Sequence, residues 1–402
     1  MAKKKIFNDP VYGFVSFPTE LLYELIDHRY FQRLRRISQL GLTHYVYPGA
    51  LHTRFHHALG ALHLMTEAIQ SLRDKDVSIT DEEFESVCIA ILLHDIGHGP
   101  FSHALEHSIL DIHHEELSVL FMEKLNDEFD GRLTLAIQIF KDQYEKHFLH
   151  ELVSSQLDMD RMDYLIRDSY FTGVAEGVIG YDRIIKMLNV VDNHLVVEEK
   201  GIYSIEKFLV ARRLMYWQVY LHKTVLSAEQ MLIAILKRAK ILITSNVKIS
   251  CSQKLHDLLA SDFSLISKEL IVKEYLDAFA ELDDIDIMAL LKNNTNHGDF
   301  ILSYTSECLL ERKLFKIYLR EGVFENKVKK EILRDVEQGL GIGEDLAKDL
   351  ILEGKESNLS YNSKKEEIRI LQKNGEVRPL SEFNTEFLKP EIVTKHYISF
   401  PQ

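Results

Sequence analysis

Apolar residues recur at helical spacing over much of the chain. The spacing predicts helical structure over residues 19–40, 57–72 and 84–93, and one long helix or two in tandem over residues 205–243. Residues 80–83, Thr-Asp-Glu-Glu, have the sequence of a capping box, which predicts that a helix begins there. No proline lies between residues 101 and 378, as is typical of a helix-rich body.

Strand signals are few and lie mostly in the second half of the chain. Residues 195–197 and 202–203 are predicted to form one hairpin, and residues 368–371 and 377–378 another, with its turn at 373–375. A further strand is expected over 313–318. The pattern therefore predicts a mainly α fold, with a helical body over residues 1–255 and a smaller α+β region over 256–402 that serves subunit contact.

Composition narrows the class of protein. Hydrophobic residues make up 46% of the 402 residues and charged residues 27%, which is typical of a globular protein. The net charge of −14 argues against bulk nucleic-acid binding, because phosphate contacts need local positive charge. The three cysteines have no paired spacing, and no apolar run reaches about 18 residues. We therefore expect a cytoplasmic protein with no membrane span and no secretory signal.

Histidines are concentrated near the N-terminus, where 14 of the 19 lie within residues 1–150. In residues 91–103, an apolar helix ends in the adjacent pair His94 and Asp95, followed by a glycine-broken turn. Adjacent helical residues point about 100° apart, so other metal ligands must come from elsewhere in the chain. A mixture of imidazole and carboxylate suits divalent ions such as Fe, Mn, Zn, Co or Mg.

Two further segments are candidates to supply those ligands. Residues 54–60 offer His57, with Arg54 on the same helical face. Residues 156–168 interleave carboxylates with apolar residues, which suggests a helix whose polar side faces a site. Within that segment, Asp158 and Asp163 are interpreted individually as solvated residues with local salt bridges.

The order of His57, then His94 and Asp95, then Asp160 resembles the H…HD…D signature of the HD-domain metal-dependent phosphohydrolases. Residues 31–41, 46–50, 94–103 and 162–168 are similar to the deoxynucleoside triphosphate triphosphohydrolases, which include dGTPase-like bacterial enzymes and the vertebrate enzyme with a sterile-alpha-motif domain. The resemblance covers about residues 5–225 and is weaker around 312–316. It implies hydrolysis of a deoxynucleoside triphosphate to deoxynucleoside and tripolyphosphate.

The resemblance also implies roles for individual residues. One divalent ion (Mn, Fe, Mg, Zn, Co or Ni) would be held by His57, His94, Asp95 and Asp160. The reaction centre would be lined by His98, His103 and His114. Substrate would be bound by Gln39, Leu40, Arg54, Arg161, Tyr164, Asp168, Arg212, Tyr220 and His222, with Arg213 as the rival of Arg212.

Elementary chemistry agrees with these roles. A triphosphate carries about four negative charges, which bidentate arginines can bind. A divalent ion polarises the phosphate and lowers the pKa of bound water. The leaving oxygen needs a proton, for which His103 and His114 are both candidates. The residues alone predict phosphoester hydrolysis, whereas the position of cleavage comes from the resemblance.

Regulated members of the family bind nucleotides between subunits and assemble as tetramers. The residues that match this second site are Lys5, Ile6, Asn8, Asp27, Gln32, Arg35 and Arg183. A carboxylate and an arginine can together read the edges of guanine. The alternative is a basic helix face that makes surface ion pairs. His28 and Tyr30 depart from the common pattern, and so does the segment at residues 11–13. The resemblance thus implies a homo-oligomer, dimer or tetramer, and leaves base choice and the activator open.

Two other functions compete with this interpretation. The same metal site would also serve an HD phosphohydrolase that acts on another nucleotide or phosphoester. A nucleotide-sensing assembly module with vestigial hydrolysis is a third hypothesis, and the complete set of metal and arginine residues weighs against it.

Overall fold

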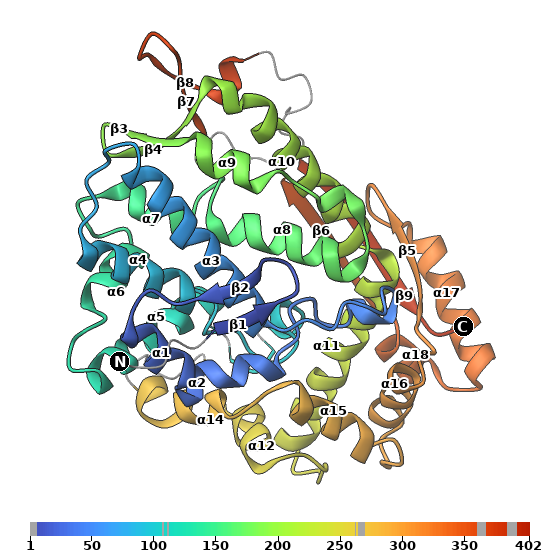
Figure 1. Cartoon of the computed structure of the whole chain (residues 1–402). Coiled ribbons are helices and arrows are strands. Elements are labelled where there is room, and N and C mark those ends of the chain that lie inside the picture. The colour runs from blue at the N-terminus through green and yellow to red at the C-terminus, as the bar shows by residue number, and fades with distance from the viewer. Residues whose placement is uncertain are drawn as a thin grey trace.

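The computed structural model describes residues 6–106, 108–110, 112–261, 263, 270–359, 367–383 and 392–402. Figure 1 shows a body of packed helices with one short N-terminal hairpin in front of it and the other strands toward its upper and right-hand sides, which confirms the predicted mainly α fold. The helices are α1 (Glu20–Asp27), α2 (Arg29–Gln32), α3 (Arg54–Arg73), α4 (Asp81–Leu93), α5 (His114–Glu128), α6 (Thr134–Phe140), α7 (His147–Val153), α8 (Met159–Thr172), α9 (Tyr181–Met187), α10 (Ile202–Met215), α11 (Lys223–Thr244), α12 (Gln253–Ala260), α14 (Leu276–Ala280), α15 (Asp284–Asn293), α16 (Phe300–Leu310), α17 (Asn326–Leu340) and α18 (Glu344–Asp349).

The described strands form three separate sheets. They are β1 (Ile6–Asp9), β2 (Gly13–Ser16), β3 (Leu188–Val191), β4 (His194–Glu198), β5 (Lys316–Arg320), β6 (Leu352–Leu359), β7 (Arg369–Leu371), β8 (Val377–Pro379) and β9 (Ile392–Phe400). The N-terminal hairpin pairs β1 with β2, a second sheet has the order β3-β4-β7-β8, and a third has the order β5-β9-β6. Strand β7 joins β4 in parallel, so the C-terminal region contributes strands to a sheet begun near residue 188.

Most of the expected helices are present, with one difference, and the alternative left open for residues 205–243 is resolved as two helices. The predicted helical stretch over residues 19–40 is broken at His28, whose backbone is extended (φ −69°, ψ 143°), and it continues as α2 and a 3-10 turn (Arg33–Arg36). The stretch over 205–243 is two helices, α10 and α11, joined by a π-helical turn (Tyr216–Tyr220). The capping box is confirmed, because Thr80 Oγ1 accepts from the Glu83 amide at 3.1 Å and the Glu83 carboxylate accepts from the Thr80 amide at 2.7 Å.

One predicted hairpin is wrong and the other is confirmed. Residues 194–198 pair with residues 188–191 on their N-terminal side, and Ile202 begins a helix. The turn is made by Asp192 and Asn193, both at positive φ (50° and 66°), the two-residue geometry that favours a tight hairpin. The second hairpin is β7 and β8, with Leu371 opposite Val377. The expected strand over 313–318 is β5, shifted toward the C-terminus.

A continuous core of buried apolar side chains runs from Val15 to Leu380, and a smaller one lies under α17 and α18. In the middle of the large core, α3 packs against both α4 and α8 (Figure 1). These three helices carry the residues of interest, because His57 lies in α3, His94 follows α4 and Asp160 lies in the first turn of α8. All three cysteines are free. Within the described part of the chain, no helix combines the length and apolar character needed to cross a membrane.

Candidate metal centre and active site

Four side chains from three helices converge on one point. His57 Nε2 lies 3.3 Å from His94 Nε2 and 3.1 Å from Asp160 Oδ1. Asp95 completes the group, with its oxygens 3.4 Å from His94 Nε2 and 3.6 Å from His57 Nε2. Ligand atoms around an ion with bonds of about 2.1 Å are separated by roughly 3.0–3.4 Å, so three of these four distances fit a single divalent ion and the separation of Asp95 from His57 is slightly longer.

The hydrogen bonds of the two imidazoles also fit a cation. His57 Nδ1 donates to Asp163 Oδ2 at 2.7 Å, and His94 Nδ1 donates to the Ile91 carbonyl at 2.6 Å. Each Nε2 then carries a lone pair in the neutral ring, and the two lone pairs face each other at 3.3 Å. This is the arrangement expected of two imidazole ligands whose second nitrogen is fixed by an outer partner.

The carboxylates make this point favourable for positive charge. When a proton takes the place of the cation on His57 Nε2, burial would lower the pKa of His57, but hydrogen bonds to Asp160 and Asp163 raise that pKa to about 10. Burial would likewise raise the pKa of Asp95, but the Arg54 guanidinium and His94 hold it well below its ordinary value. The cluster therefore keeps its carboxylates ionised although it is buried.

Asp163 is the outer partner of His57 and is completely buried. The interpretation of Asp158 and Asp163 as solvated residues is wrong, because both are 0% exposed. Asp158 caps the start of α8 by accepting from the Arg161 amide at 2.7 Å. Both buried carboxylates therefore have a structural role. Asp158 fixes where α8 begins, and Asp163 holds His57 of α3.

Arg54 connects α3 with the segment after α4. Its guanidinium binds Asp95, and its Nε donates to Ser102 Oγ at 2.7 Å. Ser102 in turn donates to the Ser38 carbonyl at 2.7 Å. Phe101 and Ser102 both have positive φ (54°), so the glycine-rich turn bends sharply here. Arg54 is thereby held beside the metal ligands, where it can also contact an anionic substrate.

His98 and His114 are stacked next to this cluster. Their rings lie 4.0 Å apart, and His98 Nε2 is 3.4 Å from Asp95 Oδ1. Gly97 permits the approach, because a Cβ there would lie 2.3 Å from the His114 carbonyl. The Glu106 carboxylate accepts from both the amide and Nδ1 of His114, at 3.0 and 2.6 Å. The side chain of His103, the third predicted histidine, lies outside the part of the protein that the structure describes.

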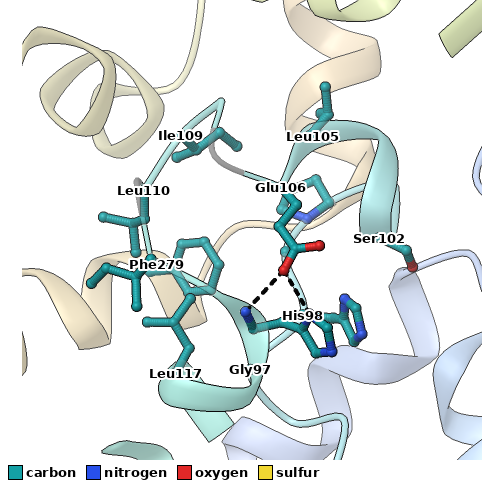
Figure 2. Close-up of a pocket in the computed structure, with 13 residues that line it drawn as sticks. Gly97, His98, Ser102, Leu105, Glu106, Ile109, Leu110, Leu117 and Phe279 are labelled. Atoms are coloured by element: carbon teal, nitrogen blue, oxygen red, sulfur yellow. Dashed lines mark hydrogen bonds and ion pairs between the residues drawn. The ribbon is translucent and has the colours of Figure 1, made fainter. Parts of the chain in front are cut away.

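Figure 2 shows the pocket that these residues line. The Glu106 carboxylate points toward the side where His98 lies, and Leu105, Ile109, Leu110, Leu117 and Phe279 surround the rest. Its free volume is about 20 Å³, which is room for about one water molecule and not for a nucleotide. The pocket is therefore a small recess beside the two histidines, mostly apolar, with the Glu106 carboxylate and the histidine rings as its polar side.

Asp168 lies in the last turns of α8 and binds two partners. Its Oδ1 accepts from His52 Nε2 at 2.8 Å, and its Oδ2 accepts from the Tyr220 hydroxyl at 2.6 Å. The Tyr220 ring lies 6.0 Å from the Tyr164 ring. His222 caps the start of α11 through Nδ1, and its ring is 6.0 Å from Tyr47. The structure thus brings Tyr164, Asp168 and Tyr220 together.

Two arginines of the predicted phosphate-binding set lie near Tyr164. Burial raises the pKa of Tyr164, and the positive charges of Arg212 and Arg161 oppose that rise. Arg161 binds Asp158, and Arg212 Nη1 donates to Gln156 Oε1 at 3.2 Å. Arg213, the rival of Arg212, is exposed.

Some buried polar atoms near these residues have no hydrogen-bond partner among the described residues. They are Gln39 Oε1, His52 Nδ1 and Arg161 Nε. The backbone amide of Gln39 donates to the His52 carbonyl at 3.0 Å, so the first two belong to one neighbourhood, next to Leu40. Buried polar groups are normally paired, so such atoms are candidates to meet a ligand.

Three residues that contact the site were not predicted from the sequence, His52, Glu106 and Arg167, and a fourth, Asp163, was interpreted as solvated. Asp163 was visible as a carboxylate one helical turn after Asp160, and its (i, i+4) spacing to Arg167 was a signal that both lie on one face. His52 and Glu106 gave no local signal, because their partners are 116 and 8 residues away and are fixed by tertiary packing.

The residues of the predicted second nucleotide site are mostly exposed. Arg35 Nε donates to Gln32 Oε1 at 2.9 Å, and its guanidinium lies 3.6 Å from the centre of the Phe55 ring. Ile6, Asn8 and Asp27 are exposed. Arg183 donates to the Lys200 carbonyl at 3.0 Å. Lys5 lies outside the described residues. A nucleotide site here stays a prediction.

Comparison with known proteins agrees with this geometry. The HD domain family model matches residues 54–168, and a model of the HD associated region matches residues 179–258. A crystal structure of a phosphohydrolase from Bacteroides thetaiotaomicron superposes with a TM-score of 0.93 at 48% identity, covering 100% of both chains. The uncharacterized protein YwfO of Bacillus subtilis is 33% identical over 79% of this chain and 72% of its own length.

The chain belongs to the HD-domain family of phosphohydrolases. This HD-domain protein is also 33% identical to a Dictyostelium discoideum homolog of deoxynucleoside triphosphate triphosphohydrolase SAMHD1, over 57% of the chain and 48% of that relative. The protein is therefore a metal-dependent phosphohydrolase, and the residues that converge on one point provide a site that fits the metal.

Proposed function

We propose that this HD-domain protein hydrolyses deoxynucleoside triphosphates to deoxynucleoside and tripolyphosphate. The observation that carries the proposal is that two predicted substrate residues each have a buried polar atom without a hydrogen-bond partner among the described residues. These atoms are Gln39 Oε1 and Arg161 Nε. A nucleotide supplies both kinds of partner, a donor for the amide oxygen and an anionic acceptor for the guanidinium. Relatives named as deoxynucleoside triphosphate triphosphohydrolases support the same substrate class.

The proposed roles are those that the family resemblance implies, and the positions of the side chains support them. The divalent ion, held by His57, His94, Asp95 and Asp160, would supply a polarised phosphate and an activated water. Arg54, Arg161 and Arg212 would bind the phosphates. Arg54 already neutralises Asp95, so its remaining N–H groups are oriented by that ion pair.

The sugar and the leaving oxygen would be served by two separate groups. Asp168 keeps further lone pairs after binding His52 and Tyr220, so it can accept from the 3′-hydroxyl. Gln39 and Leu40 would contact the sugar, and Tyr164, Tyr220 and His222 the sugar and base. His98 and His114, with His103, are the candidates to deliver a proton to the leaving oxygen. Glu106 accepts a hydrogen bond from Nδ1 of His114 and stabilises the imidazolium form, whose second proton, on Nε2, is the one that His114 would deliver to the leaving oxygen.

The experiment that tests the proposal is hydrolysis of the four deoxynucleoside triphosphates, singly and mixed, with Mn²⁺ or Mg²⁺. Products are separated by ion-exchange chromatography. We expect tripolyphosphate and deoxynucleoside in equal amounts. Release of orthophosphate or pyrophosphate would contradict the proposal and favour an HD phosphohydrolase that acts on another phosphoester.

The mixed reaction also tests the predicted activator site. If Asp27, Gln32 and Arg35 bind a guanine nucleotide, activity rises when a guanine nucleotide is added to another substrate. Replacing Arg35 by Ala should abolish that rise and leave metal binding unchanged, since Arg35 packs on Phe55 and contacts none of the four proposed ligands. A rate that is the same in single and mixed reactions would show that no activator is needed.

A further inference from the structure

Arg167 is buried between two carboxylates, one from the N-terminal hairpin that precedes the HD-domain segment and one from α8. Its Nε and Nη2 donate to Asp163 at 2.9 Å each, and its Nη1 donates to Asp9 Oδ2 at 2.7 Å. The three side chains are at most 2% exposed. Asp9 is the last residue of β1 and lies 158 positions before Arg167 in sequence. A long-range buried pair of this kind needs a reason, because burying charges is costly unless each is compensated.

The two oxygens of Asp9 have different tasks. Oδ1 accepts from the amides of Val11 and Tyr12, at 2.8 and 3.0 Å, and so forms the turn between β1 and β2. Oδ2 points inward to Arg167. The Tyr12 ring, placed by the same turn, lies 5.5 Å from the Arg167 guanidinium. The N-terminal hairpin therefore contributes one carboxylate and one aromatic ring around Arg167.

We propose that Asp9 is a positioning residue of the metal centre, which acts on His57 through Arg167 and Asp163. The contacts form one continuous chain, from Asp9 Oδ2 to Arg167, from Arg167 to Asp163, and from Asp163 Oδ2 to His57 Nδ1 at 2.7 Å. His57 Nε2, at the far side of the same ring, faces the other three ligands. Outer partners of this kind orient a metal-binding histidine and raise its basicity.

Charge explains why this series of hydrogen-bonded side chains needs Asp9. With Asp9 present, Asp9, Arg167 and Asp163 carry charges of −1, +1 and −1, so the chain has a net charge of −1 opposite the cation. Without it, Arg167 is compensated by Asp163 alone, and Nη1 is left buried without an acceptor. The guanidinium then competes with His57 for the charge of Asp163, which makes Asp163 a weaker acceptor for His57 Nδ1. The basicity of Nε2 falls as a result.

Gly60 makes room for the chain. It lies one helical turn after His57 in α3, and a Cβ there would lie 2.0 Å from Asp163 Oδ1 and 2.1 Å from Arg167 Nη2. The pair thus packs directly on the helix that carries the ligand. The outer face of the hairpin, in contrast, is open, with Ile6 59% and Phe14 75% exposed. The hydrogen-bonded series Asp9, Arg167 and Asp163 thus connects an exposed strand to a buried proposed metal ligand.

The competing interpretation is that Asp9 only clamps the hairpin to α8. Two variants separate the interpretations, Asp9→Asn and Asp9→Ser, since both keep an oxygen for the turn amides and remove the charge. Metal affinity of the metal-free protein is measured with Co²⁺ in competition with a chromogenic chelator, and the Co²⁺ absorption spectrum reports on the ligands. Neither readout depends on the identity of the substrate.

We expect both variants to weaken Co²⁺ binding by about 10- to 100-fold. In the Asp163→Asn background, Asp9→Asn should add little further loss, since its route to His57 is already broken. Phe14→Ser, on the same hairpin, is the matched control and should keep wild-type affinity whatever its effect on the melting temperature. Affinity within twofold of wild type in both Asp9 variants would overturn the proposal, as would an equal loss in Phe14→Ser. If Asp9→Asn does not fold, Asp9→Ser decides alone.

Discussion

At the scale of single residues, the metal centre is built from groups with few alternatives. Three of the four proposed ligands have one atom turned to the common point and a second atom bound elsewhere: His57 Nδ1 to Asp163, His94 Nδ1 to the Ile91 carbonyl and Asp95 Oδ2 to Arg54. Adjacent helical residues point in different directions, yet His94 and Asp95 both reach the common point. Their outer partners, the Ile91 carbonyl and Arg54, hold the two side chains in the orientations that allow this.

Replacing Asp95 by Asn removes the negative charge and keeps the size of the side chain, and it should abolish metal binding at this site. In Asp95→Asn we expect metal affinity to fall by more than about 100-fold and turnover to fall to background, because one ligand and the partner of Arg54 are lost together. Metal content and hydrolysis are measured on the same samples. His256→Ala, which removes a half-exposed histidine on α12, serves as the control. Normal metal binding by Asp95→Asn would exclude Asp95 as a ligand.

Replacing glycine by alanine should change the free energy of unfolding in opposite directions at Gly60 and Gly339. Alanine normally stabilises a helix relative to glycine by about 1 kcal/mol. At Gly60 the new Cβ would meet the buried Asp163 and Arg167, so we expect Gly60→Ala to lower the free energy of unfolding by about 2 kcal/mol. At Gly339 in α17 nothing lies within 4 Å, so Gly339→Ala should raise it by about 0.5–1 kcal/mol. Denaturant unfolding measures both, and equal effects would contradict the steric argument.

The sequence predicted that His57, His94, Asp95 and Asp160 lie together, because the HD signature is carried by short segments, and the structure brings the four side chains together; their binding of a metal ion stays a prediction. The sequence did not predict the outer carboxylate Asp163, which was interpreted as solvated although it is buried. A sequence pattern places Asp163 on the polar side of a helix, and only the packing of α3 against α8 turns that side inward. Glu106 and His52 are missed for the same reason, since their roles depend on which elements meet.

At the scale of elements, helix boundaries were predicted where a side chain fixes them. The start of α4 follows from its capping box, whereas the π-helical turn between α10 and α11 gave no signal in the apolar spacing. That turn carries Tyr220, whose hydroxyl binds Asp168, in agreement with the tendency of π-turns to lie at functional sites. The wrong hairpin at 195–203 arose because the Asp192 and Asn193 turn was overlooked in favour of Gly201.

The cap of α4 can be tested against a helix that lacks one. Thr80→Ala should lower the free energy of unfolding by about 1 kcal/mol, because Thr80 Oγ1 accepts from the Glu83 amide. Thr19 also occupies an N-cap position, before α1, but its side chain makes no capping hydrogen bond. Thr19→Ala should therefore change stability by much less. Both are measured by urea unfolding, and an equal loss would show that capping is not the cause.

At the scale of the whole molecule, the helical body and the C-terminal sheet are joined along α11. Ser227 of α11 donates to the Phe315 carbonyl at 2.7 Å and lies 3.0 Å from Ser399 Oγ of β9. The sequence predicted a mainly helical body with a smaller α+β region, and the division at residue 255 stays a prediction. Strand β7 could not be placed from the sequence, because its parallel partner β4 lies about 170 residues earlier and only tertiary structure selects it.

The same junction contains a carboxyl group with an unusual pKa. Glu229 of α11 is partly buried, and burial together with the charge of Glu356 on β6 raises its pKa to about 8. An unfolded glutamate titrates near 4.3, so between about pH 4.5 and 8 the unfolded chain loses this proton while the folded protein keeps it. Stability from this group is therefore lost as the pH rises through that window and changes no further above it.

Replacing Glu229 by Gln removes this dependence and keeps the shape of the side chain. We expect the melting temperature of Glu229→Gln to equal that of the wild type near pH 4.5 and to exceed it by roughly 2–4 °C at pH 8. Glu331→Gln, at an exposed position of α17, should show no such growing difference. Melting curves from pH 4.5 to 9 test the prediction. A difference between wild type and Glu229→Gln that is constant with pH would contradict it, because it would show that Glu229 ionises equally in the folded and unfolded states.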